Sequence, residues 1–293
     1  MLISIIIRTL NEDKYLQELL ESIERQNIGA HEKEVIIIDS GSTDSTMEIA
    51  KKFKTKITSI KKADFTFGKS LNMGTDFSNG DIAVYISGHC VPYDSLWLIE
   101  LINPIILKQA GYTYGKQIGR DTTKFSEERI FTKYFPDDAS HAQKGFFCNN
   151  ANSAIRRDLW KKYKFNETIT GLEDMDLAKR YYIDGGKIQY VNSAIVYHIH
   201  DESWTQTRRR YERESIALQD IMPEIQLSIF DTFRYIFFAI TDDSINAVKK
   251  RIFFKEFVGI VLFRVAQFFG AYRGNHFSRN LSKERKEKYF FPK

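Results

Sequence analysis

Residues 80–92, GDIAVYISGHCVP, decide how the rest of the chain is interpreted. The apolar run at 82–86 is too short for a helix and has the length of a buried strand. It ends at Ser87-Gly88-His89, where small residues let the backbone turn and one imidazole follows. Ligands of open parallel sheets bind beyond the carboxyl ends of the strands. We therefore expect His89 at the edge of a ligand-binding cleft.

Further strands alternate with helices along the chain. Short apolar runs predict strands at 2–7, 34–38, 57–60, 112–118 and 188–197, and helical spacing follows most of them. This alternation predicts an α/β fold with a mostly parallel central sheet. Residues 121–142 show no clean period and are expected to form a loop.

The pattern is helical from residue 203 onward, with helices expected at 205–220, 225–240 and 243–272. We therefore expect one domain over residues 1–202 and a helical C-terminal region over residues 203–293.

The net charge of +5 comes from this C-terminal region, where residues 201–293 hold 17 Lys and Arg against 12 Asp and Glu. Basic groups at 249–251 and 283–288 flank an aromatic, helix-spaced stripe within 249–272. Such a segment fits an anionic membrane surface better than nucleic acid, because no nucleic-acid motif accompanies the charge. The alternative is that the stripe packs on the first domain or on a second subunit.

Three carboxylates lie within four residues at a predicted helix start: Glu173, Asp174 and Asp176. Acids in a first helical turn complement the helix dipole. Crowded acids also repel one another, which raises a pKa and suits one of them to accept a proton. Arg156 precedes this cluster and offers partial charge compensation.

Two other groups of polar residues follow strands. Asp39 comes directly after the strand at 34–38, where it either forms a turn with Ser42 or contacts a nucleotide base. His198 and His200 are two residues apart on an extended segment, so they lie on one face and can meet one ligand. Together with His89 they form a weak signal for a divalent metal site, the alternative being hydrogen-bonded imidazoles at a strand end.

Five segments occur in the order and spacing typical of family 2 inverting glycosyltransferases: SIIIRTLNE (4–12), EVIIIDSGSTDST (34–46), N-x-G followed by GDIAVYIS (72–87), NNANSAIRR (149–157) and GLEDMDLAKR (171–180). The chain resembles this family over about residues 1–200, and rhamnosyltransferase-like bacterial polysaccharide enzymes most. The resemblance implies a Rossmann-like A-type glycosyltransferase fold.

The resemblance also implies roles for single residues. Asp174, beside Glu173, is expected to deprotonate the acceptor hydroxyl. The nucleotide is expected to contact a set of residues at the strand ends and nearby: Thr9, Glu12, Asp39, Ser42, Lys69, Asn72 and Ser87. Arg156 and Asp176 are expected to bind the acceptor or to support the base.

The chain departs from the family pattern at one position. The usual Asp-x-Asp, which binds the metal and the diphosphate, is replaced by Ser87-Gly88-His89. We expect His89 to take the place of the metal-binding aspartate, with His198 or His200 as a further ligand for Mg²⁺ or Mn²⁺. The alternative is that the diphosphate is held without metal by His89 or Lys69.

These observations predict an enzyme that transfers a sugar from a UDP-, dTDP- or GDP-linked donor to a lipid-linked or oligosaccharide acceptor of a bacterial surface polysaccharide. A catalytically inactive nucleotide-sugar-binding or scaffold protein is the alternative. A dinucleotide oxidoreductase is disfavoured because no G-x-G-x-x-G follows the first strand. Cys90 and Cys148 form no disulfide framework, which favours a reducing compartment. We expect a cytoplasmic protein at the inner face of the membrane, with a homo-oligomer as a further option.

Overall fold

The computed structural model describes residues 1–139, 144–276 and 289–290. The strands within these ranges are β1 (Leu2–Thr9), β2 (Glu32–Asp39), β3 (Thr55–Ser59), β4 (Ile82–Ser87), β5 (Cys90–Pro92), β6 (Tyr112–Ile118), β7 (Asn152–Arg156) and β8 (Ile188–His198). The helices are α1 (Asp13–Glu24), α2 (Thr46–Ala50), α3 (Phe67–Phe77), α4 (Trp97–Ile106), α5 (Phe125–Tyr134), α6 (Arg157–Tyr163), α7 (Glu173–Ile183), α8 (Trp204–Ile221), α9 (Ile229–Lys249) and α10 (Phe253–His276), with a 3-10 turn at Lys62–Asp64.

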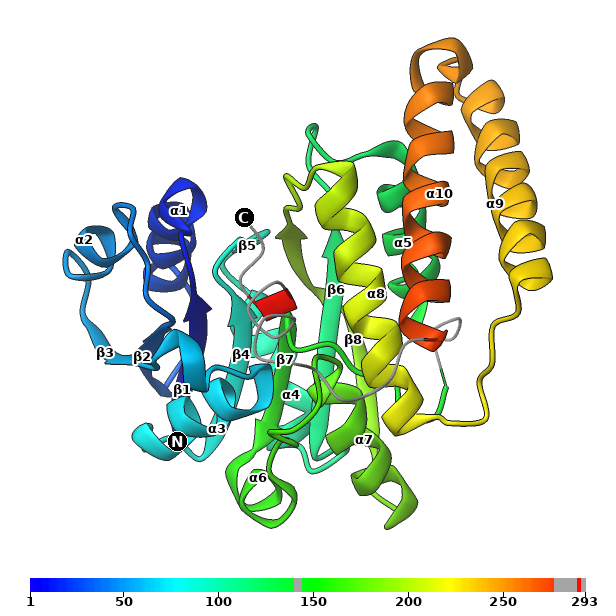
Figure 1. Ribbon diagram of the computed structural model, residues 1–293. Helices are drawn as coiled ribbons and strands as arrows, with labels where there is room; N and C mark the ends of the chain where they lie inside the picture. Colours follow the sequence, from blue (N-terminus) through cyan, green and yellow to red (C-terminus); the bar gives the residue numbers. More distant parts are fainter. Residues whose placement is uncertain (140–143, 277–288, 291–293) are drawn as a thin grey trace.

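The strands form one sheet in the order β3-β2-β1-β4-β7-β6-β8-β5 (Figure 1). β1 is parallel to β2 and β4, β2 is parallel to β3, and β6 is parallel to β8. β7 runs antiparallel to β4 and β6, and β5 runs antiparallel to β8. The predicted α/β fold with a mostly parallel sheet is therefore confirmed.

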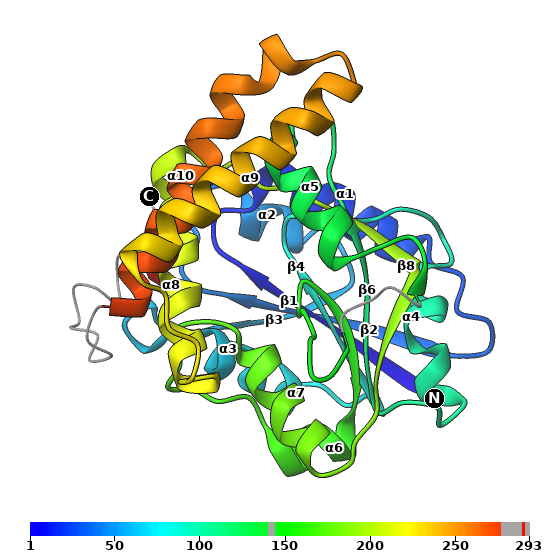
Figure 2. The same cartoon turned by 90° about the vertical axis from the view of Figure 1, so that its right-hand side faces the viewer.

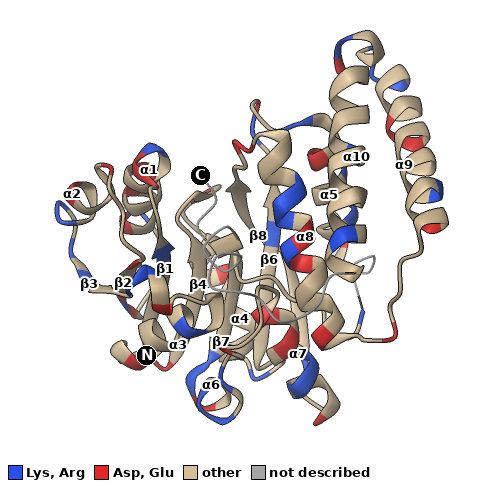
Figure 3. Cartoon of the chain, viewed as in Figure 1, with Lys and Arg blue, Asp and Glu red and all other residues tan. Residues whose placement is uncertain are grey.

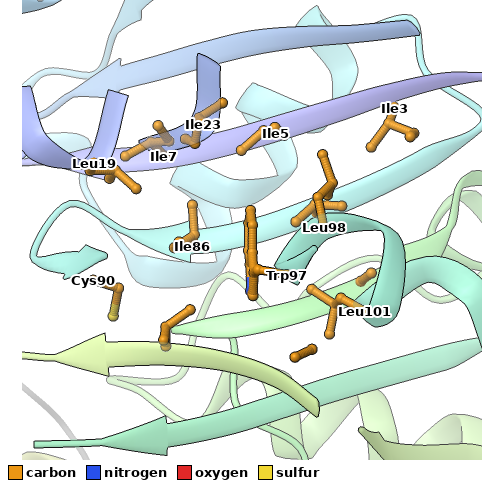
Figure 4. Packing of buried hydrophobic residues seen from close by; sticks show 14 of the residues in the cluster. Ile3, Ile5, Ile7, Leu19, Ile23, Ile86, Cys90, Trp97, Leu98 and Leu101 are labelled. Carbon is orange, nitrogen blue, oxygen red and sulfur yellow. The ribbon is translucent and has the colours of Figure 1, made fainter. Parts of the chain in front are cut away.

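Both faces of the sheet are covered, which explains why β1 is apolar along its length. Ile5 and Ile7 lie on one face with Leu19 of α1 and Trp97 of α4, and all four are fully buried (Figure 4). Ile6 points to the other face, which is packed under α3, α6 and α7 by Leu71, Trp160 and Leu177. A strand buried on both faces needs continuous hydrophobicity, as the sequence of β1 has.

Helices α8, α9 and α10 lie beyond the β6–β8 side of the sheet (Figures 1 and 2). α10 packs closely on α8 because Gly270 and Gly274 have no side chain. A Cβ atom at Gly270 would lie 2.3 Å from the carbonyl oxygen of Arg208. α9 is joined to α10 by a buried ion pair between Asp243 and Arg264, with 2.7 Å between Oδ2 and Nε. None of the helices in the described ranges has the length and apolar character needed to cross a bilayer.

The structure corrects two sequence predictions. Residues 121–142 contain helix α5 where a loop was expected. The charged Glu127 hides the apolar period of this helix, yet its side chain is buried because it pairs with His200 and with a guanidinium of α8. The break between the last two helices lies at 250–252 and not at 241–242, because Asp243 turns inward to Arg264 and lets α9 continue. The basic group at 283–288 lies outside the described residues.

Candidate active site

Polar residues from three neighbouring strands meet at one edge of the sheet. The pairing register places Thr9 of β1 beside Asp39 of β2, and Arg8 beside Ser87 of β4. Beyond Ser87 the chain enters β5, where Cys90 lies opposite His198 at the end of β8. The residues predicted at the edge of a cleft therefore do lie at one edge, because parallel strands end on the same side.

Asp174 lies in the first turn of α7 and is only 7% exposed. Its Oδ2 atom accepts a hydrogen bond of 2.7 Å from the backbone N–H of Asn150, and its Oδ1 atom accepts one from Met175. Burial raises the pKa of Asp174 to about 7, and the neighbouring carboxylate of Glu173 adds to the shift. A carboxyl group with this pKa is half ionised near neutral pH, as a general base requires.

An arginine that the sequence prediction missed connects β1 to this acidic pair. Nη1 of Arg8 lies 3.3 Å from Oε1 of Glu173. The guanidinium also lies over the ring of Phe67, 4.7 Å from its centroid, and Arg213 of α8 lies over the same ring at 4.7 Å. Arg8 therefore stands beside the acidic pair, and both guanidinium groups contact Phe67. The pattern of β1 alone could not reveal this role, because Glu173 is distant in sequence.

Asp39 organises the loop that follows β2. Its Oδ2 atom accepts hydrogen bonds from the backbone N–H groups of Gly41 and Ser42, at 2.9 and 3.0 Å. Its Oδ1 atom accepts from the hydroxyls of Ser42 and Thr9, at 2.5 and 3.3 Å. The carboxylate thus makes four contacts within the chain, which matches the turn-forming alternative. Contact between Asp39, Ser42 or Thr9 and a nucleotide stays a prediction.

His89, His198 and His200 form one group, called here the histidine cluster. One ring nitrogen from each lies within 4.8 Å of those of the other two. Each Nδ1 atom has a partner: Glu12 at 2.9 Å for His89, Gln117 at 2.6 Å for His198 and Glu127 at 2.7 Å for His200. The hydrogen bonds at Nδ1 leave the Nε2 atoms as the candidate ligands, in the pattern that orients metal-binding imidazoles.

The charges around the cluster differ from one histidine to the next. Burial, together with the facing rings of His200 and His89, holds the pKa of His198 well below its usual value. Burial opposes protonation of His89, but the Glu12 carboxylate outweighs it and raises the pKa. Glu127 is almost fully buried, yet its interactions with His200 and Arg210 outweigh burial and hold its pKa at about 2. Glu127 therefore remains ionised and fixes the orientation of His200.

Three predicted site residues have other roles in the structure. Asn72 uses its whole side-chain amide inside the fold: Nδ2 donates to Phe165 and Glu167, and Oδ1 accepts from Trp160 and Phe165. Arg156 lies beside Ile82, at the end of β4 opposite to Ser87. Its guanidinium donates to the carboxylate of Asp158, two residues along the chain. Asp176 forms an i,i+4 ion pair with Arg180 along α7. Asn72, Arg156 and Asp176 therefore have partners within the chain, and the contact of Asn72 with a nucleotide and of Arg156 or Asp176 with an acceptor stays a prediction.

Lys69 and Ser87 are half-buried, so part of each side chain can still reach a ligand. Lys69 lies in the first turn of α3, where its backbone N–H donates to the hydroxyl of Thr66. Ser87 is the last residue of β4 and its backbone N–H donates to Ala151 at 3.4 Å. The contacts of Lys69 and Ser87 with a nucleotide stay predictions.

The family model described as glycosyl transferase family 2 matches residues 4–164, more than half of the chain. The chain belongs to glycosyl transferase family 2. It is 26% identical over 223 residues to the O-antigen chain rhamnosyltransferase RfbN of Salmonella typhimurium, covering 72% of this chain and 70% of that protein. The predicted family is thereby confirmed, and with it the assignment as an enzyme of the glycosyltransferase class.

Solved structures agree with the fold of family 2. The chain aligns with residues 1–349 of TarS from S. aureus, in complex with UDP, at a TM-score of 0.57 and 16% identity, covering 93% of this chain and 91% of that one. It aligns with the mannosyltransferase PcManGT of Pyrobaculum calidifontis, in complex with GDP-Man and Mn²⁺, at a TM-score of 0.60 and 16% identity. That alignment covers 76% of this chain and 63% of PcManGT. At these identities the likeness establishes the fold.

Proposed function

We propose that this family 2 enzyme is an inverting glycosyltransferase that moves a sugar from a nucleotide-sugar donor to a growing bacterial surface polysaccharide. The observation that carries the proposal is the setting of Asp174. A buried carboxyl group with a pKa of about 7 stands at a helix start beside Arg8 and Glu173, at the edge where β1 and β4 end. Such a group is suited to remove a proton from an acceptor hydroxyl.

The chemistry is a single displacement at the anomeric carbon. The acceptor oxygen forms a bond to that carbon while the bond from the carbon to the diphosphate oxygen breaks, and the nucleoside diphosphate leaves with the electron pair. Asp174 takes the proton of the acceptor hydroxyl. The departing diphosphate carries growing negative charge, which nearby cations stabilise. Arg8 and His89 are the chain's candidates for this role, with Lys69 as a third.

A divalent ion fits the histidine cluster. The three Nδ1 atoms are held by Glu12, Gln117 and Glu127, and that leaves one ring nitrogen of each histidine for an ion. Imidazole suits Zn²⁺, Fe²⁺ and Ni²⁺ best, whereas Mg²⁺ and Mn²⁺ prefer oxygen ligands. When bound, such an ion would neutralise charge on the diphosphate. PcManGT, which shares the fold, was solved in complex with GDP-Man and Mn²⁺, and this supports the choice of Mn²⁺.

The acceptor class rests on the named relatives. RfbN is an O-antigen chain rhamnosyltransferase and TarS is a poly(ribitol-phosphate) β-N-acetylglucosaminyltransferase, so each is named for a polymer. We therefore propose a lipid-linked or oligosaccharide acceptor, reached at the inner face of the cytoplasmic membrane, and a UDP-, dTDP- or GDP-linked donor. Residues 1–202 would form the catalytic domain in this account.

A screen of nucleotide sugars tests the proposal. Each donor, with and without Mn²⁺, is added to the protein, and the melting temperature is recorded, because a ligand of the folded state raises it. Donors that bind are then assayed for transfer or for hydrolysis to the nucleoside diphosphate. We expect one nucleotide class to raise the melting temperature and to turn over. Binding without any turnover would favour the inactive scaffold, and binding of no nucleotide sugar would contradict the proposal.

A further inference from the structure

The connection between α9 and α10 exposes large apolar side chains. Phe254 is 95% exposed, Val258 is 65% exposed and Val248 is 58% exposed. Ile245 and Phe257 are also exposed on the same end of the two helices. The connection projects away from the rest of the molecule at the top of Figures 1 and 2. We call residues 245–258 the hairpin tip.

Several exposed apolar residues of the hairpin tip, Ile245, Val248 and Phe257, share one groove. A groove of about 610 Å³ runs between the two helices and is lined by Ile240, Ile245, Val248, Phe253 and Phe257. Single exposed apolar residues are normal on a soluble protein, but a continuous apolar surface indicates a partner. α9 and α10 pack on each other through Asp243 with Arg264 and through Ala247 with Ile260, whereas α9 exposes further aromatic side chains before the tip, Phe230, Phe237 and Phe238. Within the described residues, these apolar side chains of the tip remain exposed and available to a partner.

The tip is also basic. Lys249, Lys250, Arg251 and Lys255 are all exposed, and Glu256 is the acid among them (Figure 3). Lys255 lies 3.6 Å from Glu256, and Lys250 lies 3.8 Å from Glu128 of α5, so two of the cations have acidic neighbours. Both lysines still keep more than half of their side-chain surface exposed. Apolar side chains rimmed by cations are the composition that binds the surface of an anionic bilayer.

We infer that the hairpin tip docks on an anionic lipid bilayer, with Phe254 and its apolar neighbours inserted at the interface and the basic residues on the headgroups. A second copy of this chain is a poorer occupant. Two tips related by a two-fold axis would bring the four cations of one against the four cations of the other, and like charges at close range repel.

Docking of the tip would also orient the candidate active site relative to the membrane. This consequence rests on the proposed function. The tip lies toward the same side of the molecule as the ends of β1 and β8 in Figure 1. Docking of the tip would therefore turn the edge that holds Asp174 toward the membrane surface, where a lipid-linked acceptor would lie. The contact itself is independent of catalysis, because no residue of the tip belongs to the candidate active site.

Vesicle flotation tests the inference with the full chain. Vesicles of three parts phosphatidylcholine to one part phosphatidylglycerol are compared with pure phosphatidylcholine. We expect binding only to the anionic vesicles, weakened by salt because screening acts on exposed charge. The double variant Lys249→Glu, Lys250→Glu should bind at least about 30-fold more weakly, since each lost basic residue near such a surface contributes a factor of about five and the added carboxylates are repelled. Phe254→Ser should lower binding about tenfold through lost apolar insertion.

Matched controls separate the tip from general effects. Lys51→Glu with Lys52→Glu, just after α2, makes the same charge change at another exposed site, and Phe77→Ser removes a half-exposed aromatic at the end of α3. Both controls should bind as the wild type does, and all variants should keep the wild-type melting temperature and nucleotide affinity. Three outcomes would overturn the inference: no flotation with either vesicle, equal loss in tip and control variants, or a dimer by light scattering that Phe254→Ser dissociates. Because the readout is lipid binding, its failure would leave the glycosyltransferase proposal intact.

Discussion

The acidic pair of Glu173 and Asp174 comes from one helix start, whereas the histidine cluster is assembled from distant segments. Asp174 needs one helix start and one backbone N–H group, that of Asn150. The cluster needs the turn after β4, the end of β8 and partners from α1, β6 and α5. The acidic pair follows the pattern of family 2, and the cluster stands where the family pattern is broken. We therefore propose that proton removal is retained while the handling of the diphosphate has changed.

The largest effect is expected from Asp174→Asn. The amide cannot accept the acceptor proton, and loss of a general base costs about 10²–10⁴-fold in turnover. Donor affinity, measured by calorimetry, should stay near that of the wild type. Asp176→Asn is the matched control, because Asp176 lies two residues away and pairs with Arg180. Similar turnover in the two variants would remove Asp174 from the mechanism.

The pKa of Asp174 predicts how turnover depends on pH. A carboxyl group with a pKa raised to about 7 is protonated below that pH and cannot act as a base. Turnover at saturating donor should therefore approach a tenfold fall per pH unit well below 7, or a fall of about 50-fold between pH 7 and pH 5. The raised pKa also affects stability, because ionisation of buried Asp174 destabilises the fold as the pH rises through 7. The melting temperature of Asp174→Asn, compared with that of the wild type, should therefore be higher at pH 8 than at pH 5. A flat rate profile from pH 5 to pH 8 would contradict the assignment.

The affinity of the histidine cluster for a metal should depend on the residues that hydrogen-bond to the three histidines. Glu127→Gln should weaken Mn²⁺ binding about 10–100-fold, because the variant loses the carboxylate that orients His200. His89→Ala should weaken it at least as much, and His31→Ala, far from the cluster in the chain, serves as the control. Binding is measured by calorimetry and by the electron spin resonance signal of free Mn²⁺. Unchanged Mn²⁺ binding in both cluster variants, or full turnover in excess chelator, would leave His89 as a direct contact of the diphosphate.

A smaller effect is expected at Asp39. The carboxylate accepts four hydrogen bonds that hold the loop after β2, so Asp39→Ala should lower the free energy of unfolding by about 1–3 kcal/mol. Urea unfolding measures the change, with the exposed Asp64→Ala as the control. Equal stability of the two variants would show that the loop does not depend on Asp39. A loss of nucleotide affinity without a loss of stability would instead favour direct contact with the base.

The parts of the molecule that sequence could predict are those set by local pattern. The strand at 82–86 and the acidic helix start at 173–176 depend on neighbouring residues and were found where expected. Helix α5 was missed because Glu127 breaks its apolar period, and the reason for a buried acid there lies in His200 and Arg210. Contacts between residues this far apart in the sequence cannot be predicted from the local pattern, since each partner alone is an ordinary charged residue.

Asn72 shows a second limit of local pattern. Its position in a family motif predicts a ligand contact, which stays a prediction, and the sequence gives no sign that its amide bonds to residues 160–167. The place of Arg156 was also not predictable, because β7 runs antiparallel to β4 and ends beside Ile82, at the start of β4. Sequence order alone does not give strand direction, so residues next to a motif can lie at the far edge of the sheet.

The most direct test of the account is the anomeric configuration of the product. The donor identified by the screen has a known configuration, and ¹H NMR follows the new glycosidic bond as it forms. We predict the opposite configuration in the product, because Asp174 removes the acceptor proton while the diphosphate leaves from the other face of the sugar. A product that retains the donor configuration would contradict a single displacement and the role assigned to Asp174.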